Sequence, residues 1–155
     1  SILKNNDIKF EAFWIGDGPL MKEMVNLTKS QSLNIKWLGH LSKDKVYALL
    51  SKATYLIQTS DYEVYPTVVI ESFSTGTPVI STSYFGVNEL IKNSENGLII
   101  ENSIDNKLKK LVGMFKNKNN YFYMSKKCLK DYKVYHQDSS ITTKAYLDLY
   151  KALSS

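Results

Sequence analysis

Two glutamates, Glu63 and Glu71, flank an apolar run that contains Pro66. The spacing predicts a helix over 66–76 with Pro66 at its first position, which leaves the backbone N–H groups of Thr67 and Val68 without partners inside the helix. Unpaired N–H groups and the positive end of a helix dipole suit a phosphate group. The sequence therefore predicts an anion-binding loop with a carboxylate on either side.

The second glutamate, Glu71, lies among apolar residues inside the predicted helix, namely Val68, Val69, Ile70 and Phe73. A buried carboxylate without a partner is strongly destabilising, so it needs hydrogen-bond donors. The vicinal diol of a sugar offers two hydroxyl donors to the two carboxylate oxygens. Alternatively, Glu71 lies on a solvated stripe of the helix, and the residue types alone favour neither interpretation.

A second candidate loop, GDGP at 16–19, contains Gly16 and Gly18 between a predicted strand and a predicted helix. It lacks the third glycine of a G-x-G-x-x-G fingerprint, which disfavours a dinucleotide site. Two glycines still allow a backbone to come close to a ligand, although a tight strand-to-helix turn explains them equally well.

The elements that must position these loops alternate along the chain. Strands are predicted at 10–16, 35–39, 54–60, 77–83 and 97–100, and helices at 19–31, 42–53 (with Ser42 as N-cap), 66–76 and 87–93. Three further helices are predicted at 104–117, 120–132 and 139–153, with a loop at 116–120. This alternation predicts an α/β fold, a Rossmann-like doubly wound parallel sheet with helices on both faces. Ligands bind such sheets at the carboxyl ends of the strands, which here means loops 16–19, 39–42, 60–66 and 83–87.

Composition narrows the classes of function. The 155 residues suffice for one domain, and no apolar run has the roughly 20 residues of a membrane span. The beginning of the chain does not resemble a signal peptide, and the single cysteine, Cys128, is expected to be an unpaired thiol in a reducing cytoplasm.

The net charge is +5, and it is concentrated at the C-terminal end, where residues 101–155 carry 11 lysines against 5 acids. Every basic residue is lysine, so the arginine forks that usually read nucleic acids are missing and no nucleic-acid partner is expected. The basic end fits a solvated helical face or, as an alternative, a peripheral contact with an anionic membrane surface.

Several ordered segments together resemble one known family. The stretch SDYEVYPTVVIESFSTGTPVISTSYFGVNELIKNSENGLII looks like the donor-binding region of the family 4 retaining glycosyltransferases, whose signature is two glutamates separated by seven residues. Matches to Pro66, Ser72, Gly76 and the segment 78–80 support the likeness, which runs from about residue 10 to the end. The segments at 13–24 and 35–60 and the closing TTKAYLDLYKAL are also similar to family segments. One departure is Val64, where the family usually has glycine.

The resemblance implies a role for each glutamate. Glu71 matches the glutamate that holds the ribose hydroxyls of a nucleotide-sugar donor. Glu63 matches the glutamate that contacts the transferred sugar and stabilises the charge that develops at its anomeric carbon. On this interpretation the two residues grip two parts of one ligand.

The resemblance also assigns residues around the donor. Tyr65, Pro66, Thr67 and Val68 match the loop that faces the diphosphate, and Thr67 and Val68 can donate backbone N–H groups there. Beside them, His40 and Leu41 match the loop next to the nucleobase, and Gly16 and Gly18 match glycines that line the donor cleft.

No metal and no cofactor other than the substrate is expected. His40 and His136 are isolated in the sequence, and no D-x-D pair is present. The resemblance implies a retaining reaction in which the leaving diphosphate takes the proton of the acceptor.

The family's fold, GT-B, pairs two Rossmann-like domains across a cleft. Residues 1–155 are expected to form the single C-terminal, nucleotide-sugar-binding domain, without its first strand and without the N-terminal acceptor domain. This chain alone is expected to fold but not to transfer sugar. The acceptor is expected to be a glycan or a lipid-linked sugar in bacterial polysaccharide biosynthesis, reached in the cytoplasm or at the inner face of the cell membrane.

Two rival functions remain open. One is a nucleotide-sugar epimerase of the same fold, against which the SDYEVYP loop argues. The other is a non-catalytic sugar-nucleotide-binding or interaction module. Nucleotide binding distinguishes the module from the enzymes, and product analysis distinguishes the two enzymes.

Overall fold

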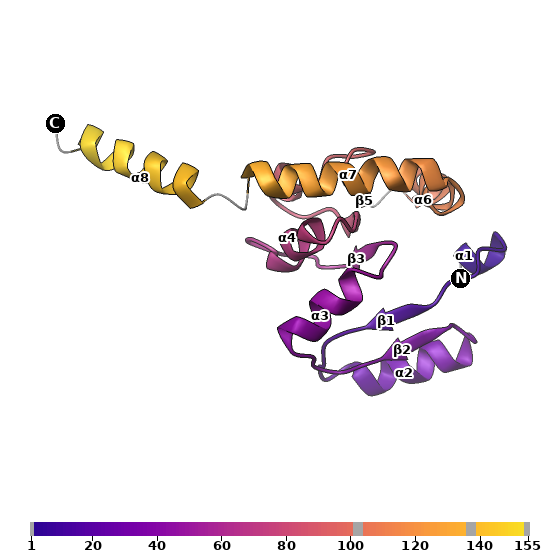
Figure 1. Ribbon diagram of the computed structural model, residues 1–155. Coiled ribbons are helices and arrows are strands. Elements are labelled where there is room, and N and C mark those ends of the chain that lie inside the picture. The colour runs from indigo at the N-terminus through magenta and orange to yellow at the C-terminus, as the bar shows by residue number, and fades with distance from the viewer. Residues whose placement is uncertain (1, 101–103, 136–138, 154–155) are drawn as a thin grey trace.

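The computed structural model in Figure 1 describes residues 2–100, 104–135 and 139–153. In chain order the elements are α1 (Ile2–Asn5), β1 (Ala12–Trp14), α2 (Met21–Ser30), β2 (Ile35–Trp37), α3 (Lys43–Leu50), β3 (Leu56–Gln58), α4 (Thr67–Ser74), β4 (Val79–Thr82), α5 (Val87–Leu90), β5 (Gly97–Ile100), α6 (Ile104–Lys116), α7 (Lys118–Tyr135) and α8 (Ser139–Leu153). The predicted alternation of strands and helices is confirmed. Only α1 was not expected.

All strand pairs of the described residues are parallel, as predicted, and helices connect successive strands. The strands form two sheets. One sheet pairs β1 with β2, and the other has the order β3-β4-β5. Among the described residues β1 does not pair with β3, so each of these strands keeps one unpaired edge.

The larger sheet is covered on both faces. Because side chains alternate along a strand, the neighbours Val79 and Ile80 on β4 point to opposite sides. Val79 packs in a buried cluster with Phe73 of α4, whereas Ile80 packs in a second cluster with Met124 of α7. Burial on both faces explains why two successive residues of β4, Val79 and Ile80, are both apolar.

Two predicted boundaries were wrong. Pro66 is the N-cap of α4 and not its first helical residue, because its backbone is extended (ψ 98°) and the helix begins at Thr67. The predicted loop at 116–120 is also helical except at Asn117. The Asn117 side-chain oxygen accepts the N–H of Asn120 at 3.1 Å. This capping bond stabilises the start of α7, which only Asn117 separates from the end of α6.

A buried polar cluster fastens α7 to the turn before β5. The side-chain amide of Asn96 donates to Asp131 Oδ2 at 2.9 Å and to the Leu90 carbonyl at 3.0 Å. Cys128 donates its thiol hydrogen to the Asn96 carbonyl at 3.3 Å. Burial raises the pKa of Cys128 to about 12, so the thiol stays protonated at neutral pH and is a poor nucleophile.

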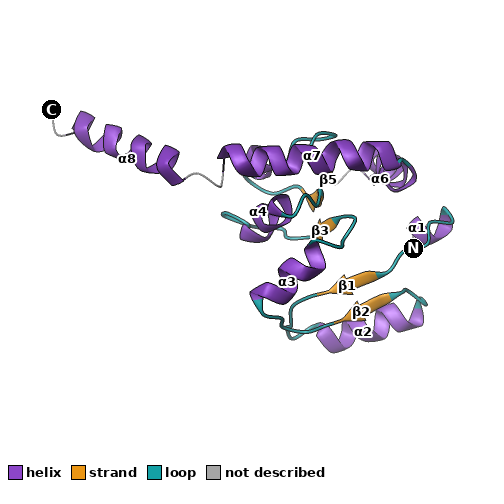
Figure 2. Cartoon of the chain, in the orientation of Figure 1, coloured by secondary structure: helices purple, strands orange, loops and turns teal. Residues whose placement is uncertain are grey.

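The C-terminal helix α8 extends away from the other elements, as Figure 2 shows. Its side chains that are described from residue 143 onward are exposed, including Tyr146, Leu147 and Tyr150. Within the described ranges no helix combines the length and the apolar character needed to cross a membrane.

Among the glycines, Gly97, the first residue of β5, lies closest to the backbone of a neighbouring strand. A Cβ atom added there would collide with the carbonyl oxygen of Val79 and press against Ile91. We expect Gly97→Ala to lower the free energy of unfolding by about 2 kcal/mol or more, as overpacking against backbone does. Chemical denaturation of the two proteins measures this difference.

Gly113 provides the matched control, because it lies in helix α6 and a Cβ there meets no atom within 4 Å. Gly113→Ala should therefore stabilise the chain by up to about 1 kcal/mol. Equal stability of the Gly97→Ala variant and the unmodified chain would contradict the packing described for β4 and β5.

Candidate functional site

The loops that follow β1 and β2 are joined by backbone hydrogen bonds. The Gly16 N–H donates to the Gly39 carbonyl at 2.8 Å, and the Leu38 N–H donates to the Trp14 carbonyl at 2.9 Å. Gly16 has φ +117° and Gly39 has φ +63°, values that side-chain-bearing residues rarely adopt. The predicted loops 16–19 and 39–42 therefore lie together at the carboxyl ends of their strands.

The beginning of α4 presents unpaired backbone donors. The N–H of Val69 donates to the Pro66 carbonyl at 3.0 Å. The N–H groups of Thr67 and Val68 have no acceptor among the described residues, and Pro66 provides no side-chain cap. Thr67 is exposed and Val68 is half-buried. The geometry therefore supports the predicted pair of free amides at the positive end of a helix dipole.

Glu71 lies in the middle of α4 with 19% of its side chain exposed, so it is neither fully buried nor on a solvated stripe. Its Oε1 lies 3.8 Å from Nζ of Lys43. The Lys43 side chain is 72% exposed, and so loose a pair contributes little to stability. The contact nevertheless brings the start of α3, just after loop 39–42, beside Glu71.

Glu63 is held by a different set of partners. Its Oε1 accepts the Ser60 hydroxyl at 3.1 Å and Nε2 of Gln58 at 3.5 Å. The Oε1 of Gln58 in turn accepts the Tyr84 hydroxyl at 3.3 Å. Burial raises the pKa of Tyr84, and the negative charge of Glu63 adds to the effect, so this hydroxyl remains a donor at neutral pH.

The other predicted residues differ in what they can offer. Gly18 is exposed, but its N–H already donates to Asp17 Oδ1 at 2.7 Å. His40 is exposed and Leu41 is half-buried, both in the loop after β2. Tyr65 is 56% exposed, next to the buried Pro66.

Three residues of this region were missed by sequence reasoning. Lys43 could have been recognised as unusual, because it is the first residue of α3, where the helix dipole disfavours a cation. Gln58 also had one, since it is a polar residue within a predicted apolar strand. Tyr84 had none, because its role depends on contacts between the ends of β3 and β4.

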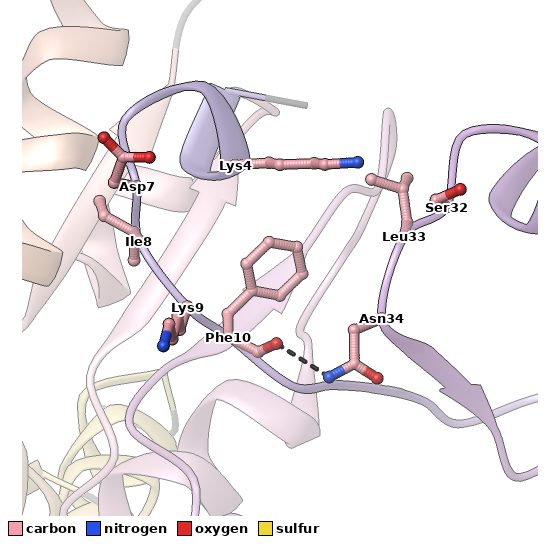
Figure 3. A pocket seen from close by; sticks show the side chains of 8 residues that line it. All are labelled: Lys4, Asp7, Ile8, Lys9, Phe10, Ser32, Leu33 and Asn34. Atoms are coloured by element: carbon pink, nitrogen blue, oxygen red, sulfur yellow. Dashed lines mark hydrogen bonds between the residues drawn. The ribbon is translucent and has the colours of Figure 1, made fainter.

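A separate hollow of about 470 Å³ lies at the other end of the first sheet (Figure 3). Its lining residues precede β1 and β2 in the sequence: Lys4, Asp7, Ile8, Lys9, Phe10, Ser32, Leu33 and Asn34. The Asn34 side chain donates to the Phe10 carbonyl at 3.1 Å across this end. The hollow is therefore on the amino-terminal side of the strands, at the opposite end of the sheet from the loops 16–19 and 39–42.

Metal ligands do not gather in the part of the chain that the structure describes. No group of three or more His, Cys, Asp or Glu side chains is placed there to hold an ion.

Comparison with known proteins connects this geometry to a family. Residues 1–130 match the family model described as "Glycosyl transferases group 1". An alpha-1,4-N-acetyl-D-galactosaminyltransferase of Campylobacter jejuni, named for a diphospho-undecaprenol-linked substrate, is 31% identical over 138 residues, which cover 86% of this chain and 38% of that protein. An uncharacterised glycosyltransferase of Methanocaldococcus jannaschii is 34% identical over 107 residues, covering 68% of this chain and 30% of that protein.

The solved structure of HepE from Anabaena in complex with UDP-glucose superimposes with a TM-score of 0.77 at 18% identity, over 91% of this chain and 41% of that one. The chain thus spans about a third of the length of the curated relatives named above. Its fold is the one found in GT-B glycosyltransferases. The match over residues 1–130 shows that this chain belongs to the family of group 1 glycosyl transferases.

Proposed function

We propose that this chain is the donor-binding part of a retaining glycosyltransferase that takes a nucleotide-diphosphate sugar. The observation that carries the proposal is the start of α4, where two free N–H groups lie in the sequence between two carboxylates that have different partners. Because the chain belongs to a glycosyl transferase family, we infer that this region binds the activated sugar that such a reaction uses.

Each group at the start of α4 then has a task. The N–H groups of Thr67 and Val68 bind the diphosphate, and Glu71 accepts hydrogen bonds from the ribose hydroxyls. The Lys43 ammonium leaves Glu71 readily when a ribose arrives, because their pair is loose and Lys43 is largely exposed. Gly16 and Gly18 line the cleft, and His40 and Leu41 lie beside the base.

Glu63 serves the transferred sugar. Two donors already fix its Oε1, so the carboxylate is oriented before the donor arrives. A fixed negative charge stabilises the positive charge that develops at the anomeric carbon as the bond to the diphosphate breaks. The leaving diphosphate accepts the proton of the acceptor hydroxyl, and the reaction proceeds without a metal.

The relatives suggest the classes of substrate. The name of the Campylobacter jejuni relative includes a lipid-linked diphospho-undecaprenol sugar, and the HepE structure contains UDP-glucose. We infer a nucleotide-diphosphate hexose as donor and a glycan or lipid-linked sugar as acceptor, in bacterial polysaccharide biosynthesis in the cytoplasm. The acceptor binds a further domain, and a further parallel strand completes the sheet between the unpaired edges of β1 and β3.

Glu71→Ala should weaken the binding of a nucleoside diphosphate by about 1.5–3 kcal/mol, because it removes hydrogen bonds to a charged group. Calorimetric titration with uridine diphosphate and, as a second base, guanosine diphosphate measures the change. Glu89→Ala, which removes an exposed carboxylate from α5, is the matched control and should bind like the unmodified protein. If the Glu71→Ala variant bound the nucleoside diphosphates as tightly as the unmodified protein, Glu71 would not bind the ribose.

Glu63→Gln should behave in the opposite way. It keeps the shape of the side chain but loses the charge that acts in the transition state, so turnover should fall while nucleoside diphosphate affinity stays nearly intact. Product analysis with protein of natural length, a donor and an acceptor measures transfer. If affinity and turnover fell by the same factor, Glu63 would be a ground-state contact and the division of roles would be wrong.

The basic C-terminal helices suggest a membrane contact. Residues 101–155 carry 11 lysines against 5 acids, and we propose that they hold the protein against the anionic inner leaflet of the cell membrane. Co-sedimentation with vesicles should increase with the fraction of anionic lipid and fall with added salt. Binding that depends on neither variable would rule out this contact.

A further inference from the structure

Gln58 is a polar residue at a buried position of the sheet. It ends β3 and is 7% exposed, whereas the preceding Ile57 is 56% exposed. An amide at such a position destabilises the fold unless its donors and acceptor find partners. An apolar side chain would fill the place without that requirement, so the contacts of Gln58 need an explanation.

Those contacts form a directed chain of hydrogen bonds. Tyr84 is 8% exposed, and its hydroxyl donates to Oε1 of Gln58 at 3.3 Å. The amide nitrogen of Gln58 then faces Oε1 of Glu63 at 3.5 Å. Because an ionised carboxylate only accepts, Glu63 selects the orientation that points the amide nitrogen of Gln58 toward it. In that orientation Oε1 of Gln58 is left to accept the Tyr84 hydroxyl, which stabilises the same arrangement.

The same two strand ends are linked by the backbone of the loop. Thr82 at the end of β4 donates its hydroxyl to the Ser60 carbonyl at 2.6 Å, while the Ser60 hydroxyl donates to Glu63. Ser60 and Gln58 both bond Oε1 of Glu63, so the other carboxylate oxygen takes no part in this network. The rigid ends of β3 and β4 thereby fix a carboxylate that belongs to a loop.

We propose that Gln58 is a positioning residue for Glu63 and that Tyr84 holds Gln58 in the required amide orientation. The inference rests on the proposed function, because it gives Gln58 a role in transfer through Glu63. The role assigned to Gln58 is exerted through its contact with Glu63. Its effect is to keep one carboxylate oxygen bound to the protein and the carboxylate plane fixed, so that Glu63 meets the sugar without reorganisation.

The kinetic test uses Gln58→Leu, Tyr84→Phe and the double variant in protein of natural length. Gln58→Leu should lower kcat about tenfold with the donor KM within about twofold of the unmodified value, since the lost orientation matters in the transition state. Tyr84→Phe should lower kcat less. The double variant should resemble Gln58→Leu, because Tyr84 acts only through Gln58.

Thr77→Val is the matched control for a merely structural effect. Thr77 is a buried polar residue just before β4 whose hydroxyl donates to the Leu50 carbonyl at 2.7 Å, away from Glu63. This variant should lose stability and keep its kcat. If Gln58→Leu left kcat unchanged in an active enzyme, or if the losses of the two single variants multiplied in the double variant, the positioning role would be overturned while the proposed function would stand.

A second measurement tests the contact between Gln58 and Glu63 without an activity assay. It remains informative even if the protein transfers no sugar, a result that would rule out the proposed function. Nuclear magnetic resonance of the 155-residue chain reports the side-chain amide signals of Gln58. Glu63→Gln should shift these signals, and Asp61→Asn, which neutralises an exposed carboxylate of the same loop, should leave them in place. If the Gln58 signals did not shift in the Glu63→Gln variant, Gln58 would not contact Glu63 and the inference would be overturned.

Discussion

The structure depends on one constraint, the unpaired backbone donors at the start of α4. A helix cannot satisfy its first N–H groups internally, and Pro66 caps α4 without offering a side chain to them. Thr67 and Val68 therefore keep their donors available at the carboxyl end of a parallel sheet, where the positive end of the helix dipole adds to them. The two carboxylates that flank these donors give the region chemistry beyond anion binding.

The rest of the fold keeps that helix end in place. Val69 and Phe73 bury one face of α4 against β4 and α7, and the hydroxyl of Ser72 donates to the Thr77 carbonyl at 2.7 Å across the turn to β4. Asn96 and Asp131 hold α7 against the turn before β5. A carboxylate on such a rigid helix, Glu71, needs no loop rearrangement to meet a ligand, whereas Glu63 is on a loop and is bonded to Ser60 and Gln58.

Most of the fold was predictable from local patterns, and the site only in part. Pro66 and Gly76 bound a helix that could be read directly, and the apolar runs located the five strands of the described residues. The contacts of Lys43 with Glu71 and of Tyr84 with Gln58 join residues 28 and 26 positions apart, so no local pattern contains them. The loop predicted at 116–120 was wrong because the capping bond of Asn117 outweighs the loop-forming composition around it. The division of the strands into two sheets was also not predictable, because the hydrophobic periodicity of a sequence does not specify which strands pair.

The most direct test of the account is to locate a nucleoside diphosphate on the chain. Nuclear magnetic resonance titration with uridine diphosphate follows every backbone N–H group at once. We expect the largest shifts at Thr67 and Val68 and in the loops 16–19 and 39–42, with the hollow between Lys4 and Asn34 unaffected. Shifts that gather around that hollow and leave Thr67 and Val68 unchanged would contradict it.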